Sequence, residues 1–174
     1  MNHNKPQILA LDLATTTGFA HSSGKSGTVS FLARRGESPG MKFFEFRSWL
    51  VQFISGTPTD LICYEQSGYH RSNAATHSAH GLIAVTELVC TEFGIELTNR
   101  SPNEIKNFAC PEMSAAKVKK AHMMRAADNK WPNVDFSDDN EIDAVFLLDL
   151  IETQLGLDYG SFGSRKIEAE GART

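Results

Sequence analysis

Residues 8–20 read ILALDLATTTGFA, an aliphatic run that ends in Asp12 and continues into three threonines and a glycine. A short apolar run bounded by turn residues predicts a buried strand over residues 7–13. Two further strands are predicted over 17–21 and 27–33, joined by the turn sequence SSGKSG, as an antiparallel meander. A lone carboxylate in such a strand needs a chemical reason, because burying an unpaired charge is costly.

Helices and strands alternate after this meander. TDLICYEQ predicts a strand that ends in Glu65, and SPNE at 101–104 has the form of a capped helix start. The other elements predicted from apolar spacing and turn residues are helices over 41–54, 72–93, 114–130 and 139–156 and a strand over 94–100. This order predicts an α/β fold with a mixed five-stranded sheet flanked by helices. We expect one domain over 1–157 and a flexible C-terminal tail over 158–174.

Composition favours a globular protein in a reducing, cytoplasmic setting. The chain has 174 residues, and no stretch approaches the roughly 18 to 20 apolar residues that span a bilayer. The first residues, MNHNKPQ, are polar and do not resemble a secretory signal. Cys63, Cys90 and Cys110 are odd in number and lack C-x-x-C spacing, so neither a disulfide framework nor a zinc site is predicted.

Charge is unevenly distributed along the chain. The net charge is −4, but residues 131–158 contain eight Asp or Glu and no Lys or Arg. Residues 100–130 contain seven basic and three acidic side chains. A basic segment beside an acidic one can bind a phosphate backbone and a metal ion respectively, although a solvated helix face explains the same pattern equally well.

Four carboxylates are candidates for one site. Asp12 and Glu65 belong to strands, and Asp139 and Asp143 lie four residues apart on one face of the last apolar helix. Clustered carboxylates suit Mg²⁺ or Mn²⁺, and two such ions can cleave a phosphodiester. Taken singly, Asp12 and Asp139 are better explained as turn or cap residues. Asp143 is different, because it precedes AVFLLDLI and lies near an apolar face.

The segments ILALDLATTTGFA, DLICYEQ, EIKNFACPEMSAAKVKKAHMM and DDNEIDAVFLLDL together resemble the RuvC-type Holliday junction resolvases, and their phage or prophage branch in particular. The resemblance spans residues 7 to about 153. It implies an RNase H-like fold, a homodimer, and Mg²⁺- or Mn²⁺-dependent cutting of four-way DNA junctions by paired nicks, as in DNA recombination and repair. Two metal ions per active site are expected.

By position, the resemblance makes Asp12, Glu65 and Asp143 metal ligands and catalytic residues. The family often places its fourth acidic ligand three residues before the last aspartate, where this chain has Asn140. Either Asp139 takes that role or Asn140 coordinates through its amide oxygen; we favour Asp139.

The resemblance also assigns DNA contacts. Lys106 and Lys117 match lysines near the scissile phosphate, with Lys117 counted among the catalytic residues. The remaining residues expected to contact DNA are Lys119, Lys120 and Arg125 on the phosphate backbone, and Tyr69, His70 and Arg71 in a loop that enters the junction. His122 is interpreted as structural, although activation of a water is an alternative. The helix over 72–93, in which Gly81 would allow close approach, resembles the dimer-forming element of the family.

Three alternatives remain open at this stage. A general RNase H-like nuclease that acts on branched DNA or RNA–DNA hybrids would use the same carboxylates. A junction-binding protein without catalysis is the second alternative, but it would have no reason to keep buried carboxylates that repel one another. The opening D-x-x-T-T-x-G also resembles the phosphate-binding loop of sugar kinases and actin-like ATPases, but those proteins need a second domain that 174 residues do not supply.

Overall fold

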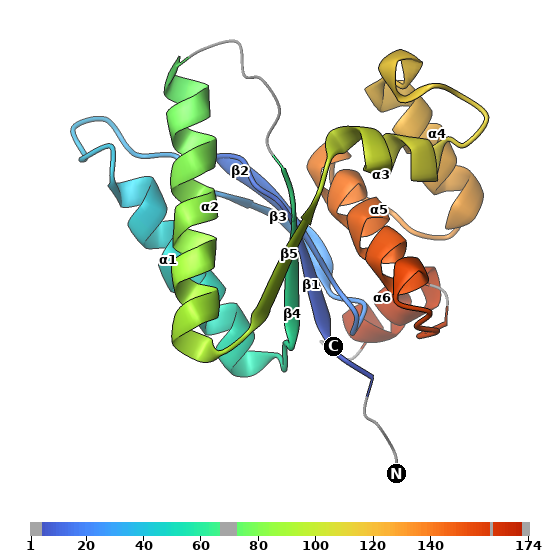
Figure 1. Ribbon diagram of the computed structural model, residues 1–174, viewed down its shortest axis with the longest axis horizontal. Helices are drawn as coiled ribbons and strands as arrows, with labels where there is room; N and C mark the ends of the chain where they lie inside the picture. The colour runs from blue at the N-terminus through green and yellow to red at the C-terminus, as the bar shows by residue number, and fades with distance from the viewer. Residues whose placement is uncertain (1–4, 67–72, 161, 172–174) are drawn as a thin grey trace.

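The computed structural model describes residues 5–66, 73–160 and 162–171. A mixed five-stranded sheet lies between two layers of helices (Figure 1). The strands are β1 (Ile8–Asp12), β2 (Thr16–His21), β3 (Ser26–Ser30), β4 (Leu61–Glu65) and β5 (Glu96–Arg100). The helices are α1 (Met41–Gly56), α2 (Asn73–Phe93), α3 (Pro102–Ala109), the 3-10 turn η1 (Ala115–Lys117), α4 (Lys120–Lys130), α5 (Asp139–Gln154) and α6 (Phe162–Gly171).

The sheet combines the predicted meander with parallel crossovers. Its strand order is β3-β2-β1-β4-β5, in which β1, β2 and β3 pair antiparallel while β1, β4 and β5 pair parallel. The central strand β1 is therefore antiparallel to one neighbour and parallel to the other. The predicted α/β fold with a mixed five-stranded sheet is confirmed.

Two hydrophobic cores cover the two faces of the sheet, because side chains along β1 alternate between them. Leu9 and Leu11 pack against α1 and α2, whereas Ile8 and Ala10 pack against the layer formed by α3 to α6. Helix α5 lies against the centre of that second face (Figure 1). It is buried on nearly all sides, as the apolar run in its sequence suggests.

The predicted basic helix over 114–130 is interrupted. Residues 115–117 form η1, Val118 and Lys119 are extended, and α4 begins only at Lys120. Val118 is buried, and the ring nitrogen Nδ1 of His122 accepts a hydrogen bond from the backbone N–H of Lys119 at 3.0 Å. The interruption thus turns an apolar side chain inward, and His122 caps the helix that follows.

Two further expectations differ from the structure. The expected flexible tail contains α6, whose Phe162 and Lys166 are buried against the rest of the chain. The close approach at Gly81 is made to α1 of the same chain, because an added Cβ would lie 2.3 Å from Cε1 of Phe43. None of the described helices is both long and apolar enough to cross a membrane.

Candidate active site

The carboxylates of Asp12 and Glu65 are brought together by the register of two parallel strands. Leu11 of β1 pairs with Tyr64 of β4, so Asp12 and Glu65 occupy the next positions along neighbouring strands. The alternation along both strands directs the two carboxylates to the face covered by α5. Adjacent strands lie about 4.8 Å apart, which makes the two side chains direct neighbours.

Helix α5 supplies the other two carboxylates from its first turns. Its N-cap residue Asp138 accepts a hydrogen bond from the backbone N–H of Glu141 at 3.0 Å and another from the hydroxyl of Thr28 at 2.7 Å. The cap fixes where the helix starts, and the four-residue spacing places Asp139 and Asp143 on one face.

Close packing at Gly18 determines how near the first turn of α5 lies to strand β2. A Cβ added to Gly18 in β2 would lie 1.9 Å from the backbone carbonyl oxygen of Asn140. Only glycine permits β2 and the first turn of α5 to approach this closely.

Burial and mutual repulsion raise the pKa values of the Asp12, Glu65 and Asp143 carboxyl groups. The pKa of Asp12 is well above its ordinary value because of burial, then because of the negative charges of Glu65, Asp143 and Asp139. Burial and the charge of Asp143 raise the pKa of Glu65 to about 7. Burial and the charge of Asp139 raise the pKa of Asp143 to about 6. Each of these three carboxylates therefore lacks enough positive charge nearby to offset its burial.

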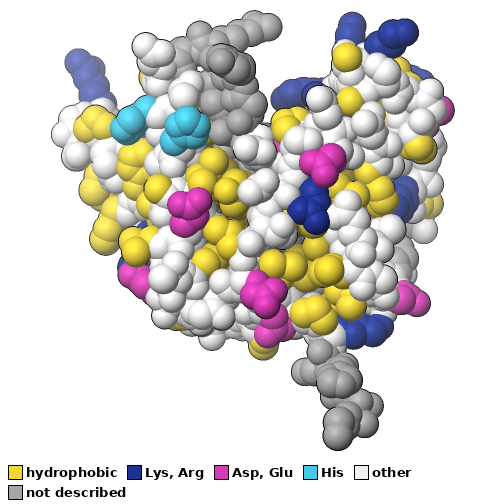
Figure 2. Space-filling model, in the orientation of Figure 1, with side chains coloured by type: hydrophobic (Ala, Val, Ile, Leu, Met, Phe, Trp, Pro, Cys, Tyr) yellow, Lys and Arg dark blue, Asp and Glu magenta, His cyan; other side chains and the backbone are white. Residues whose placement is uncertain are grey.

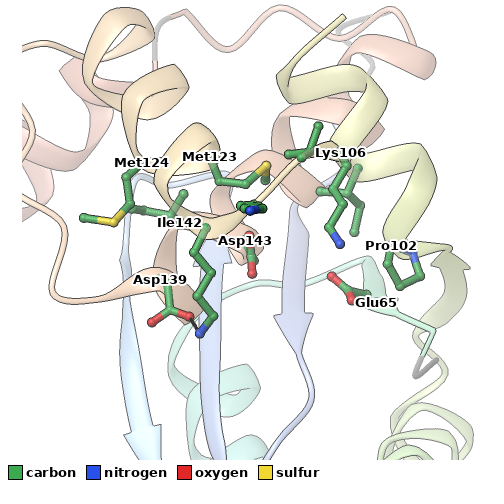
Figure 3. Close-up of a pocket in the computed structure, with 12 residues that line it drawn as sticks. Glu65, Pro102, Lys106, Met123, Met124, Asp139, Ile142 and Asp143 are labelled. Atoms are coloured by element: carbon green, nitrogen blue, oxygen red, sulfur yellow. Dashed lines mark hydrogen bonds and ion pairs between the residues drawn. The ribbon is translucent and has the colours of Figure 1, made fainter. Parts of the chain in front are cut away.

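A cavity of about 390 Å³ opens beside Glu65, Asp139 and Asp143 (Figure 3), whereas Asp12 does not line it. In Figure 3, the carboxylates of Glu65 and Asp143 and the amine of Lys106 point into the same space. The full lining consists of Glu65, Pro102, Ile105, Lys106, Val118, Lys119, Lys120, Met123, Met124, Asp139, Ile142 and Asp143. The lining therefore combines three carboxylates with three lysines, which suits a phosphate group bound beside a cation.

Asp139 and Asn140, the two candidates for the fourth ligand, have different surroundings. Asp139 lines the cavity and forms an ion pair with Lys120, whereas the backbone of Asn140 lies against Gly18. The choice of Asp139 over Asn140 stays a prediction. The ion pair with Lys120 is exposed on the lysine side, where such pairs contribute little stability.

The predicted basic residues divide into two groups. Lys106, Lys119 and Lys120 line the cavity. Lys117 is exposed on η1 and does not line it, and Arg125 lines a neighbouring depression beside Lys130 instead. Lys117 is expected nearer the scissile phosphate than Lys120 because of the family resemblance alone, and that assignment stays a prediction.

Three predicted residues lie outside the described residues. Tyr69, His70 and Arg71 belong to the loop expected to enter a junction, between β4 and α2. Their assignments stay predictions.

The donor set fits a hard divalent cation by its chemistry. Carboxylate oxygens are the ligands that Mg²⁺ and Mn²⁺ prefer, and the raised pKa values show charges that a cation would neutralise. Within the described part of the chain, however, no three acidic, histidine or cysteine side chains are grouped closely enough to hold one ion.

Solved structures with this RNase H-like architecture include two of RuvC. Thermus thermophilus RuvC in complex with a Holliday junction substrate matches with a TM-score of 0.69 at 10% identity, over 87% of this chain and 96% of that chain. A second Thermus thermophilus RuvC structure matches with a TM-score of 0.65 at 10% identity, over 86% of this chain and 96% of that chain.

The yeast mitochondrial Holliday junction resolvase Ydc2 matches with a TM-score of 0.62 at 12% identity, over 94% of this chain and 81% of that chain. The chain thus has the RuvC-type fold. No protein-family model matches it, and no curated protein matches it in sequence.

Proposed function

We propose that the chain is a divalent-metal-dependent endonuclease that cuts branched DNA, with the four-way junction as its preferred substrate. The observation that carries this proposal is that carboxylates from β1, β4 and α5 interact electrostatically next to a cavity that Lys106, Lys119 and Lys120 line. The likeness to RuvC bound to a Holliday junction supports the choice of substrate. Recombination or repair of DNA in the cytoplasm would be the setting.

The carboxylates are assigned to Mg²⁺ or Mn²⁺. Asp12, Glu65 and Asp143 would hold two ions, with Asp139 completing the set and Asn140 as the alternative. When bound, such ions activate water and stabilise the oxygen that leaves a phosphodiester. The carboxylates would hold the ions at the end of the sheet, and their burial would limit the access of other water molecules.

The lysines are assigned to the phosphate. Lys106 points into the cavity beside Glu65 and can neutralise charge that builds on the scissile phosphate. Lys119 and Lys120 line the same cavity and would hold the DNA backbone on either side of that phosphate. In Figure 2, Lys and Arg side chains gather over the part of the molecule formed by α3 and α4. Lys117 and Arg125 are assigned to more distant phosphates of the same strand.

Paired nicks require two active sites, so a homodimer is part of this proposal. Helix α2 is the contact we favour, because hydrophobic and histidine side chains gather over it in Figure 2. Leu88 on this helix is 51% exposed, so its side chain is available for such a contact.

A substrate panel tests the proposal. The wild-type protein would be incubated with Mg²⁺ or Mn²⁺ and end-labelled four-way junction, flap, fork, RNA–DNA hybrid and linear duplex. Symmetric paired nicks in the junction, with the linear duplex intact, are expected. Preferential cutting of the hybrid would replace the proposal with a hybrid nuclease. Tight junction binding without cutting in either metal would indicate a binding protein.

A further inference from the structure

Between the two α5 carboxylates of the candidate site lies a third acidic residue that faces the opposite way. Glu141 is 1% exposed and does not line the cavity. Its carboxylate accepts hydrogen bonds from the hydroxyl of Ser26 in β3 and from the backbone N–H and hydroxyl of Ser137, the last two at 2.7 Å each. It also accepts one from Nζ of Lys166 at 2.6 Å. One side chain thereby joins α5 to three separate segments.

Lys166 comes from α6, and its charge is almost completely buried. Its side chain is 6% exposed, and Nζ also donates to the backbone oxygen of Asp135 at 3.0 Å. The ammonium lies 5.0 Å from the centre of the Phe136 ring. Asp135 and Phe136 belong to the segment that leads into α5, so Lys166 holds both the helix start and the chain before it.

A second ion pair between α6 and α5 provides an internal comparison. Arg165 pairs with Glu152 at 2.8 Å, and both side chains are largely buried. Glu152 lies eleven residues beyond Glu141, about 16 Å farther along the helix. The adjacent residues Arg165 and Lys166 thus bind opposite ends of α5. Of these two, Lys166 binds the N-terminal end, where Asp139 and Asp143 lie.

We propose that Lys166 and Glu141 are positioning residues that fix the first turn of α5, so that Asp139 and Asp143 face the cation. This inference rests on the proposed function. Buried ion pairs contribute little net stability, but they specify one arrangement because any other leaves a charge unpaired. Metal ligands need such fixing, because small displacements of the supporting side chains weaken the site.

The test compares Lys166→Met with Arg165→Met in the full chain. Each variant removes one buried cation from α6, so both are expected to lower the melting temperature. The discriminating measurement is the Mn²⁺ dissociation constant by calorimetric titration of DNA-free protein. Lys166→Met is expected to weaken Mn²⁺ binding roughly tenfold, in line with other residues that support metal ligands. Arg165→Met should stay within about twofold of wild type, and Lys166→Arg should recover most of the loss.

Ser26→Ala provides a milder variant in case Lys166→Met does not fold. It removes one hydrogen bond from the Glu141 carboxylate and is expected to weaken Mn²⁺ binding about threefold. Equal Mn²⁺ affinity in the Lys166 and Arg165 variants, or an unchanged affinity in Ser26→Ala, would overturn the positioning role while leaving the nuclease proposal intact. A wild-type protein that neither binds Mn²⁺ nor cuts a junction would overturn both.

Discussion

At the scale of single residues, the buried carboxylates of the candidate site lower the stability of the metal-free protein. The folded-state pKa of Asp143 is raised to about 6, above the ordinary 3.8. A raised pKa means that the folded state favours the protonated carboxyl. The associated stabilisation is complete below the unfolded pKa and is lost as the pH rises through 6. At pH 8 without metal, the charge of Asp143 therefore opposes folding.

Asp143→Asn should stabilise the metal-free protein at pH 8. Removing the charge is expected to raise the free energy of unfolding by about 1 to 2 kcal/mol, because the neutral amide escapes both burial of charge and repulsion. Thermal unfolding in EDTA at pH 8 and pH 5 measures this, and the gain should shrink at pH 5, where the wild-type carboxyl is protonated. A melting temperature at or below wild type at pH 8 would contradict the electrostatic account.

The pH dependence of cutting should follow the same groups. Protons and the cation compete for Glu65, whose pKa is about 7, and for Asp143, whose pKa is about 6. At a fixed low Mn²⁺ concentration, we expect the rate of junction cutting to fall as the pH drops below 7. A tenfold increase in Mn²⁺ should move that fall to lower pH. If the dependence of the cutting rate on pH is the same at both Mn²⁺ concentrations, these carboxylates do not bind the metal.

At the scale of elements, the sequence predicts those strand ends and helix starts that depend on interactions between residues close together in the chain. Strand ends at Asp12 and Glu65 follow from apolar runs, and the start of α3 follows from Ser101, whose side chain completes a capping box with Glu104. The interruption before α4 depends on Val118 entering the core, which no spacing reveals. Helix α6 depends on distant partners, although Arg165 and Lys166 are the first basic residues after Lys130 and could have indicated partners for buried acids.

The packing of α5 on β2 predicts a sharp contrast between two glycines. Gly18→Ala should lower the free energy of unfolding by about 2 to 3 kcal/mol and reduce cutting, because its Cβ would displace the backbone at Asn140. Gly56→Ala is the control, since no atom lies within 4 Å of its added Cβ near the end of α1. That variant should be neutral or more stable by up to about 1 kcal/mol. Urea unfolding measures both, and equal stability of the two variants would refute the close approach at Gly18.

At the scale of the whole molecule, the proposed homodimer is testable through α2. Leu88→Lys places a charge on the exposed face of this helix and should shift sedimentation equilibrium from dimer to monomer. The four candidate carboxylates are untouched, so Mn²⁺ binding should persist while paired nicking falls. A wild-type protein that sediments as a monomer would contradict the dimer, and a Leu88→Lys variant that remains dimeric would place the contact elsewhere.

The central claim is that Asp12, Glu65 and Asp143 form the metal-dependent centre of a nuclease for branched DNA. Its most direct test compares wild type with Asp143→Asn on one four-way junction, measuring binding in Ca²⁺ and cutting in Mn²⁺. The account predicts that the variant binds the junction within about threefold of wild type and cuts at least about a thousandfold more slowly. Undiminished cutting by Asp143→Asn would contradict it.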